Sequence, residues 1–278
     1  MEKKKKQTKR EKQISRGFAA INAVYRELPD TQGCMEHINK RTEQGGCGGW
    51  CCRLQNPHVL FVEFLNTWEY ILKKWEWQSI HDLIERAIRN YLSQSVIKGC
   101  IFWDQNTKLC GCHTVRPYNC RIYGIVPEEE IKPRIEQLRV LYQDPNGHFI
   151  KDQCSLVSTV DGKPVTTSMT NNWWKKMTEA EESIGIKKRD IHAENSSGSY
   201  MTYHDHLLIH ILPDFVMKQL QILRVHGNME EKETAIRGIM EGFKSRLSQE
   251  GVSVAALKGI DNDQKTTSQL QEKKDTSI

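Results

Sequence analysis

The distribution of cysteines constrains this chain more than any other feature. All nine lie in the first 154 of 278 residues, in two groups followed by a single position. A chain of this length buries a core without crosslinks, so the thiols are not needed to staple the fold. Clustered thiols that stay reduced are typical of metal or catalytic sites rather than disulfide frameworks. The candidate ligands are Cys34, Cys47, Cys51, Cys52, Cys100, Cys110, Cys112, Cys120 and Cys154.

The start of the chain does not have the pattern of a secretory signal. Its lysine-rich residues lead into the short stretch GFAAINAV, which Asn22 interrupts and which no small-residue cleavage site follows. No apolar run approaches the roughly 18 residues that cross a bilayer. We therefore expect a cytoplasmic protein that does not enter a membrane, in a compartment that keeps thiols reduced.

The net charge of +5 comes from the N-terminus. Residues 1–16 hold eight Lys or Arg side chains against two acids, and the remainder is close to neutral. A basic arm can bind nucleic acid or an anionic membrane by releasing counterions. A lysine-rich terminus is more often a solvated chain end. The sequence favours the second interpretation, and nucleic acid stays a weaker candidate partner.

Apolar spacing predicts a mainly α-helical fold. Residues 61–75 repeat apolar side chains at helical intervals, and the pattern continues through 79–99 to a stop at Gly99. Pro127 and three glutamates predict the start of a helix that runs to about Tyr142 despite Pro133. Two further helices are expected over residues 204–227 and 229–249.

One segment favours strand structure. Residues 156–168 are β-branched around Asp161-Gly162, which favours a short β-hairpin. The end of the chain lacks apolar periodicity. The predicted organisation is a basic arm and helix over residues 1–28, a cysteine-cluster metal-binding domain over 29–154, a helical region over 155–255 and a disordered tail over 256–278.

The spacing of the thiols suits metal-binding loops between helices. Four glycines around Cys47 give the backbone freedom to wrap around an ion. Cys51 and Cys52 are adjacent, and neighbouring side chains in an extended segment point to opposite sides, so they do not easily share one tetrahedral ion. The paired C-x2-C motifs of a zinc ribbon are absent.

The stretch CIFWDQNTKLCGCHTVRPYNCRIYGIVP, preceded by GGCGGWCC, resembles the cysteine-cluster family of zinc- or iron-chelating proteins, to which the flagellin lysine N-methylases are related. The family pattern is C-x2-C-x2-C-C or a near variant, then C-x-F/L…C-x-I-Y-x-x-R-P-x-x-C-R. The matching positions are Cys100, Phe102, Cys110, Arg116-Pro117 and Cys120-Arg121. The resemblance covers roughly residues 34–154.

Two departures from the family pattern concern the ligand set. Cys112 and His113 stand where the family has Ile-Tyr, which adds a thiol and an imidazole beside the site. The first group is wider, because Cys34 lies 13 positions before Cys47. Which four thiols share a site therefore stays open.

Three residues beside the thiols are candidate cofactor-binding groups. Arg116 and Arg121 could offset the negative charge that thiolates accumulate around a metal. The alternative is that both arginines pair with Glu128–Glu130. His113 is a candidate ligand or proton donor because it follows Cys112.

The choice of metal rests on the ligand pattern. A structural zinc site closes around four ligands, whereas iron-sulfur clusters take thiolates from dispersed positions. We therefore expect one or two iron-sulfur clusters of the [4Fe-4S] type, with zinc as the alternative. The family resemblance implies an oxidoreductase role or modification of a protein or peptide, with a peptide substrate or a redox partner. No catalytic constellation is visible, so whether the protein is an enzyme stays open. The competing hypothesis is a zinc-stiffened interaction or nucleic-acid-binding module without catalysis.

Two further patterns are weaker. His206 and His210 are four apart on one predicted helix, which suits a transition metal but equally suits histidines at the edge of a packing helix. Trp173 and Trp174 precede two lysines and could stack a base, although such pairs usually pack against a neighbouring helix. No glycine-rich nucleotide-binding motif is present.

Overall fold

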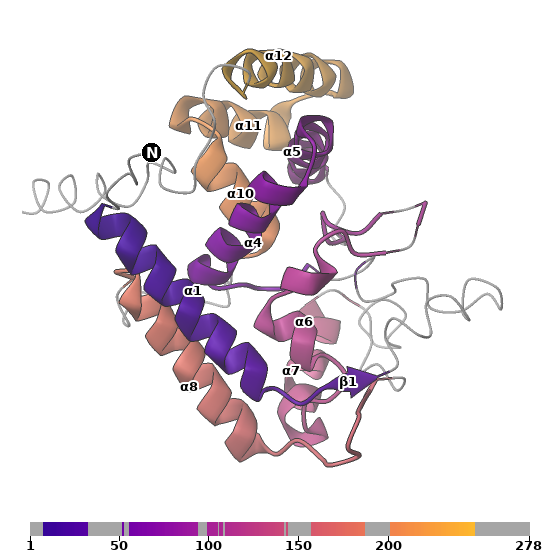
Figure 1. Cartoon of the computed structure of the whole chain (residues 1–278). Helices are drawn as coiled ribbons and strands as arrows, with labels where there is room; N and C mark the ends of the chain where they lie inside the picture. The colour runs from indigo at the N-terminus through magenta and orange to yellow at the C-terminus, as the bar shows by residue number, and fades with distance from the viewer. Residues whose placement is uncertain are drawn as a thin grey trace, which may run out of the picture.

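The computed structural model describes residues 8–32, 52, 56–93, 99–104, 106–107, 109–141, 143, 157–186 and 201–247. About 70% of these residues are helical, which confirms the predicted mainly α fold (Figure 1). Most of the first cysteine group, Cys154 and the predicted tail at 256–278 lie outside the described residues.

Two long helices lie side by side along one edge of the molecule, α1 (Lys9–Glu27) and α8 (Thr167–Ser183) (Figure 1). α1 begins with a capping box, in which Thr8 Oγ1 accepts from the Glu11 amide and the Glu11 carboxylate accepts from the Thr8 amide. Its buried positions recur every three or four residues. They are Ile14, Gly17, Ile21 and Val24.

Two amphipathic helices follow each other along the chain, α4 (Phe61–Lys74) and α5 (Trp77–Leu92). α4 matches the helix predicted for residues 61–75 and buries most of its side chains. α5 ends at Leu92 with Ser93 as its C-cap, seven residues before the predicted stop at Gly99. Its buried face follows the predicted helical spacing. That face consists of Ile80, Leu83, Ile84, Ala87, Ile88 and Leu92.

Three helices cover the other side of α5: α10 (Tyr203–Ile211), α11 (Asp214–His226) and α12 (Met229–Leu247) (Figure 1). The prediction of a single helix over residues 204–227 is wrong, because the helix is interrupted at Leu212–Pro213. Proline lacks the amide that would continue the helix and disfavours helical geometry in the residue before it. The predicted second helix is present as α12.

The cysteine-bearing chain continues into three short or exposed elements: the 3-10 turn η1 (His113–Val115), α6 (Tyr118–Ile122) and α7 (Glu128–Leu141). α7 confirms the helix predicted after Pro127. Where the structure describes the predicted hairpin, from residue 157 on, it forms the single strand β2 (Ser158–Thr159), whose antiparallel partner is β1 (Thr31–Gln32) instead of a local strand. Residues 162–166, which the second arm of that hairpin would need, have no regular secondary structure, and α8, which the sequence interpretation did not predict, begins at Thr167.

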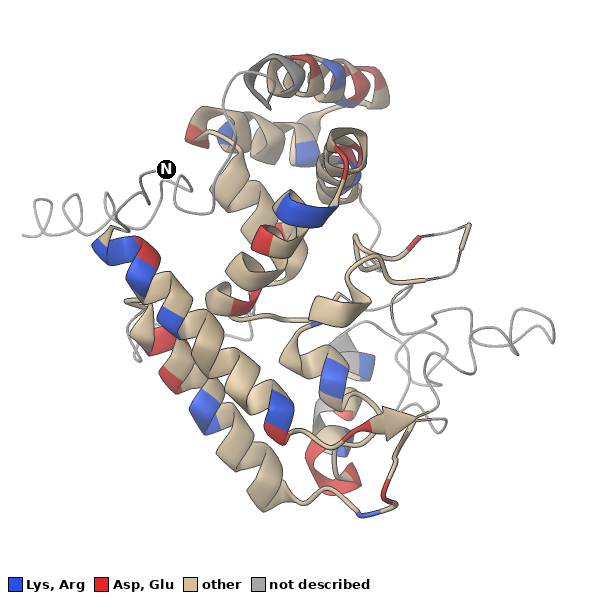
Figure 2. Cartoon of the chain, in the orientation of Figure 1, with Lys and Arg blue, Asp and Glu red and all other residues tan. Residues whose placement is uncertain are grey.

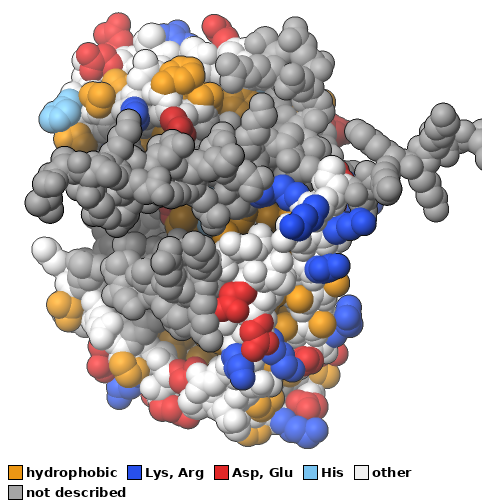
Figure 3. Space-filling model, turned by 90° about the vertical axis from the view of Figure 1, so that its left-hand side faces the viewer, with side chains coloured by type: hydrophobic (Ala, Val, Ile, Leu, Met, Phe, Trp, Pro, Cys, Tyr) orange, Lys and Arg blue, Asp and Glu red, His pale blue; other side chains and the backbone are white. Residues whose placement is uncertain are grey.

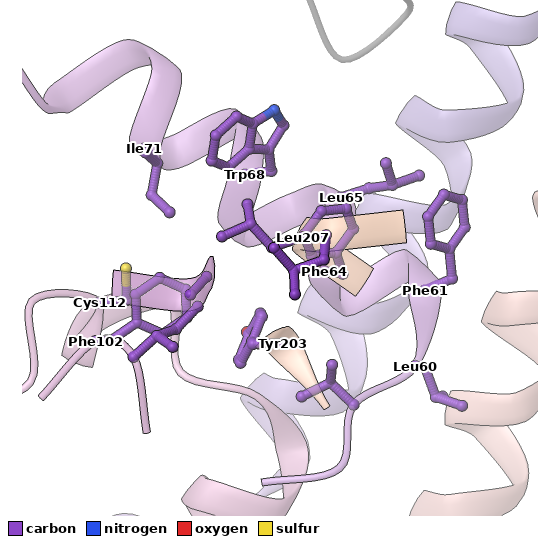
Figure 4. Packing of buried hydrophobic residues seen from close by; sticks show 14 of the residues in the cluster. Leu60, Phe61, Phe64, Leu65, Trp68, Ile71, Phe102, Cys112, Tyr203 and Leu207 are labelled. Atoms are coloured by element: carbon purple, nitrogen blue, oxygen red, sulfur yellow. The ribbon is translucent and has the colours of Figure 1, made fainter. Parts of the chain in front are cut away.

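Buried side chains from α1 to α12 belong to one hydrophobic cluster. Phe64, Leu65 and Trp68 of α4 lie at its centre, together with Tyr203 and Leu207 of α10 (Figure 4). The cluster extends into the cysteine-bearing loop through Phe102 and Cys112 (Figure 4). The part of the loop that carries these two residues is therefore packed on the helical core, whereas its tip at Asn106 and Thr107 is exposed.

Basic side chains mark the first turns of α1 (Figure 2). Lys9, Lys12 and Arg16 are exposed there. On the neighbouring face, basic side chains gather in one region and hydrophobic ones are scattered among polar groups (Figure 3). Within the described residues, no helix has the length and apolar character needed to span a membrane.

Candidate metal centre

The second cysteine group begins in a narrow loop that doubles back on itself. Residues Trp103 and Cys110 face each other in an antiparallel bridge. The amide of Asp104 donates to the Leu109 carbonyl at 2.9 Å, and the amide of Gly111 donates to the Phe102 carbonyl at 2.9 Å. These bonds bring Cys100 and Cys110, ten positions apart in sequence, to the same end of the loop.

A series of tight turns carries the chain from Cys110 to Cys120. The amide of His113 donates to the Cys110 carbonyl at 3.2 Å, and that of Val115 donates to the Cys112 carbonyl at 3.0 Å. Pro117 then precedes the short helix α6, which bears Cys120. Proline suits this position, since the start of a helix does not need its missing amide.

The two cysteine groups meet through the backbone. The amide of Cys100 donates to the carbonyl of Cys52 at 2.6 Å. Cys52 is the last residue of the GGCGGWCC segment, and it is half-buried against the core. This contact places the end of the first group directly beside the start of the second.

The described thiols have different surroundings. Cys112 is 1% exposed and belongs to the same buried cluster as Phe102 and Tyr203 (Figure 4). Burial raises the pKa of the Cys112 thiol strongly, and negative charge on Cys110 and Cys100 raises it further. Cys100 is buried, whereas Cys110 and Cys120 are half-buried. Cys112, Cys110 and Cys100 therefore lie within electrostatic range of one another.

His113 and Arg116 form a contact of their own. Arg116 Nη1 donates to His113 Nε2 at 2.5 Å, so the histidine accepts at Nε2 and carries its proton on Nδ1. Burial lowers the pKa of His113 to about 4, and the charges of Arg116 and Arg121 contribute. The imidazole is therefore neutral near pH 7, with Nε2 already engaged.

The Arg121 side chain bridges two backbone carbonyls that lie between Cys112 and Cys120. Its Nε donates to the Arg116 carbonyl at 2.8 Å and its Nη2 to the Thr114 carbonyl at 3.0 Å. The guanidinium also lies over the ring of Tyr25, 4.2 Å from its centroid. Among the described residues, no ion pair joins Arg116 or Arg121 to Glu128–Glu130, which counts against the alternative that the arginines pair with those acids.

Trp75 is a site residue that the spacing of cysteines does not reveal. A Cβ atom at Gly111 would lie 2.9 Å from Cζ2 and 3.2 Å from Cη2 of the Trp75 indole. The same indole meets Phe102 edge-on, with ring centroids 6.3 Å apart. Gly111 thus separates Cys110 from Cys112 because no side chain fits under Trp75. Glycine between two cysteines was the available signal.

Glu63 and Glu181 are buried carboxylates that the sequence analysis also missed. Glu63 is 2% exposed and Glu181 is 4% exposed, and both accept hydrogen bonds at the N-terminus of α4. Burial raises the pKa of Glu63, and the hydrogen bonds it accepts oppose that shift. Helical spacing puts Glu63 on the side opposite the apolar positions of the predicted helix, so its burial had no signal in the sequence.

The remaining predicted ligands Cys34, Cys47, Cys51 and Cys154 lie outside the described residues. Within the described ranges, no three His, Cys, Asp or Glu side chains are arranged to hold a metal ion. The donor set nevertheless fits a thiophilic metal, since soft thiolates select zinc, copper(I) and iron-sulfur clusters.

The histidines of α10 are packed in the core. His204 Nε2 donates to the Ala87 carbonyl at 2.8 Å, and His206 Nε2 donates to the Val59 carbonyl at 3.2 Å. The rings of His206 and His210 stack 5.7 Å apart, and His210 lies 4.4 Å from the Phe61 ring. These contacts support the packing interpretation over a metal site.

The tryptophan pair of α8 also packs. Trp173 is 3% exposed, and the Trp174 ring lies 6.0 Å from that of Tyr118. Trp173 is therefore unavailable to stack a base from solution, and the packing alternative holds for it.

Residues 43–146 match a family model named CxxCxxCC and described as a "Putative zinc- or iron-chelating domain". The resemblance to the cysteine-cluster family is thus confirmed over this segment, which contains most of both cysteine groups. No curated protein and no solved structure matches the chain.

Proposed function

We propose that the cysteine-rich segment binds an iron-sulfur cluster through thiolates of both cysteine groups. The observation that carries the proposal is the hydrogen bond from the Cys100 amide to the Cys52 carbonyl, because it joins the two groups at one place. Burial and negative charge on Cys110 and Cys100 raise the pKa of Cys112, which is consistent with three neighbouring thiols on the same loop. The match to a zinc- or iron-chelating domain supports a bound metal, and the choice of an iron-sulfur cluster is our proposal.

Iron-sulfur is favoured over zinc for two reasons. The thiols come from separate turns rather than from paired C-x2-C knuckles, which suits the wider span of a cluster. Nine thiols also exceed the four that a structural zinc site uses and suffice for one or two clusters. A bound cluster would supply one-electron chemistry or a Lewis-acid iron.

The residues of this chain would hold and tune such a centre. Cys100, Cys110 and Cys120 are the family-like thiolates, and Cys112 is an additional candidate. Arg116 and Arg121 keep positive charge beside them, which offsets the negative charge of metal-bound thiolates. The role that fits is redox chemistry or modification of a protein or peptide, with a protein as substrate or electron partner.

Metal and sulfide analysis tests this proposal. Protein purified without oxygen should be brown and contain iron and acid-labile sulfide, because sulfur-to-iron charge transfer absorbs visible light. Single substitutions Cys100→Ser, Cys110→Ser and Cys120→Ser should each lower the iron content. Trp173→Phe, a core change on α8, should leave it unchanged. Colourless protein with stoichiometric zinc would overturn the iron-sulfur proposal and favour the zinc-stiffened module.

A further inference from the structure

Glu63 is a buried carboxylate surrounded by donors. Its Oε1 accepts from the Tyr25 hydroxyl and from the Tyr118 amide, each at 2.6 Å. Its Oε2 accepts from the Leu60 amide at 3.0 Å. Three donors converge on one side chain that is 2% exposed, which matches an ionised acceptor better than a protonated one.

One of these donors belongs to the cysteine-bearing helix. Tyr118 is the first residue of α6, and Cys120 follows two positions later. The bond from its amide therefore ties α6 to the first turn of α4. Five-residue helices have few internal hydrogen bonds, so an external anchor determines where their side chains lie.

Tyr25 connects this carboxylate to a positive charge. Its hydroxyl donates to Glu63, while its ring face carries the Arg121 guanidinium at 4.2 Å. Arg121 in turn holds the carbonyls of Thr114 and Arg116, which lie between Cys112 and Cys120. One network of contacts therefore joins Glu63, through Tyr25 and Arg121, to the backbone between Cys112 and Cys120.

The charge of Glu63 reaches the same place as the thiols. The hydroxyl of Tyr203 lies 2.5 Å from Thr67 Oγ1; burial raises the pKa of this tyrosine, and negative charge on Glu63, Cys120 and Cys112 raises it further. Thr67 also donates to the Val115 carbonyl at 3.2 Å, inside the cysteine-bearing turn. In a buried environment such charges interact strongly, because little water screens them.

We propose that Glu63 is a positioning residue of the metal centre, which fixes the Cys120-bearing helix through the amide of Tyr118. This inference rests on the proposed metal-binding function and specifies how the helical core controls it. Outer residues of this kind orient ligands and tune the metal, and their loss typically weakens binding 10- to 100-fold.

Glu181 of α8 provides a matched control, because it accepts hydrogen bonds at the same end of α4 as Glu63 does. It is equally buried, and it accepts from the amides of Phe61 and Val62, which belong to α4 itself, at 2.8 and 2.7 Å. Glu63→Gln and Glu181→Gln both remove a buried charge from the start of α4. Only the first presents an amide NH2 group to the donors that include Tyr118.

The test compares full-length proteins loaded with cobalt(II) alone. Thiolate-to-cobalt absorption reports the ligand environment, and competition with a chelator reports affinity. We expect Glu63→Gln to bind roughly 10- to 100-fold more weakly and to shift the absorption band. Glu181→Gln should keep the wild-type band and affinity although it unfolds more easily. Tyr25→Phe, which removes one donor only, should shift the band in the same direction by less.

Three outcomes are distinguishable. Equal affinities and unshifted bands in Glu63→Gln and Glu181→Gln would overturn the positioning role. If Glu63→Gln does not fold, an unchanged band in Tyr25→Phe would overturn it instead. Wild-type protein that binds no cobalt, zinc or iron through thiolates would contradict the proposed function itself.

Discussion

At the scale of single residues, Cys112 and His113 are where the chain departs from the pattern of the cysteine-cluster family that it resembles. The structure places the Cys112 thiol in the core and gives His113 an arginine partner. Sequence spacing drew attention to both residues. It could not show that one faces the interior, because a turn reverses the direction of side chains without any periodic signal.

Gly111 offers a direct test of the packing around these residues. Gly111→Ala should destabilise the protein by about 1–3 kcal/mol, since the new methyl group would press on the rigid Trp75 indole. Urea unfolding measures this change. In a Trp75→Leu background, Gly111→Ala should lower the free energy of unfolding by less than it does in the wild-type protein. An equal cost in both backgrounds would show that the new methyl group does not press on Trp75.

At the scale of elements, strongly periodic segments were predicted best. α4 and α7 match their predicted ranges closely, because apolar spacing and terminal residues agree there. The sequence analysis missed α8 because the β-branched residues before it favoured a hairpin, and β2 pairs instead with a strand more than a hundred residues away. Such long-range pairing has no local sequence signal.

The crossing of α1, α4 and α8 can be probed at Gly17. A Cβ atom there would collide with Ile184 Cγ2 and lie 3.0 Å from Val62 Cγ2. Gly17→Ala should therefore cost about 1–3 kcal/mol, which exceeds the helix-propensity gain of alanine over glycine. Thermal unfolding measures the effect.

The control for this crossing is Gly238 on α12, where an added Cβ atom has nothing within 4 Å. Gly238→Ala should raise stability by up to about 1 kcal/mol, because only helix propensity changes. Stabilisation of similar size at Gly17 would contradict the close packing of α1.

At the scale of the whole molecule, the predicted organisation into four regions stays a prediction, while one buried cluster joins α1, the cysteine-bearing loop and the C-terminal helices. The candidate site depends on this shared core. Glu63 on α4 and Tyr25 on α1 both support α6, and neither lies in the cysteine-bearing loop. Sequence patterns identify candidate ligands, whereas the residues that hold them come from distant helices whose contacts no local pattern encodes.

Global stability should fall in mild acid because of His206. Burial lowers the pKa of this histidine to about 3, with the charge of His210 as a further cause. The unfolded chain takes up this proton below about pH 6.5, where the folded state does not. Stability should therefore decrease from about pH 6.5 down to about pH 3, by up to about 1.4 kcal/mol per pH unit from this group.

Urea unfolding at several pH values checks this dependence. His206→Gln should flatten the profile in that range, although it lowers stability at neutral pH. His226→Gln, at an exposed position on α11, should retain the wild-type slope. An unchanged slope in His206→Gln would assign the acid sensitivity to other groups.

The hydrogen bond between Cys100 and Cys52 has a mechanical consequence. α4 and α5 lie between these two residues in sequence, so the bond closes the segment that contains both helices into a loop. A metal bound by both cysteine groups would crosslink the same segment and reduce the entropy that it gains on unfolding. Under the proposed function, metal release and opening of these two helices would then be a single linked equilibrium. Bound metal would thus raise the free energy of unfolding of the protein.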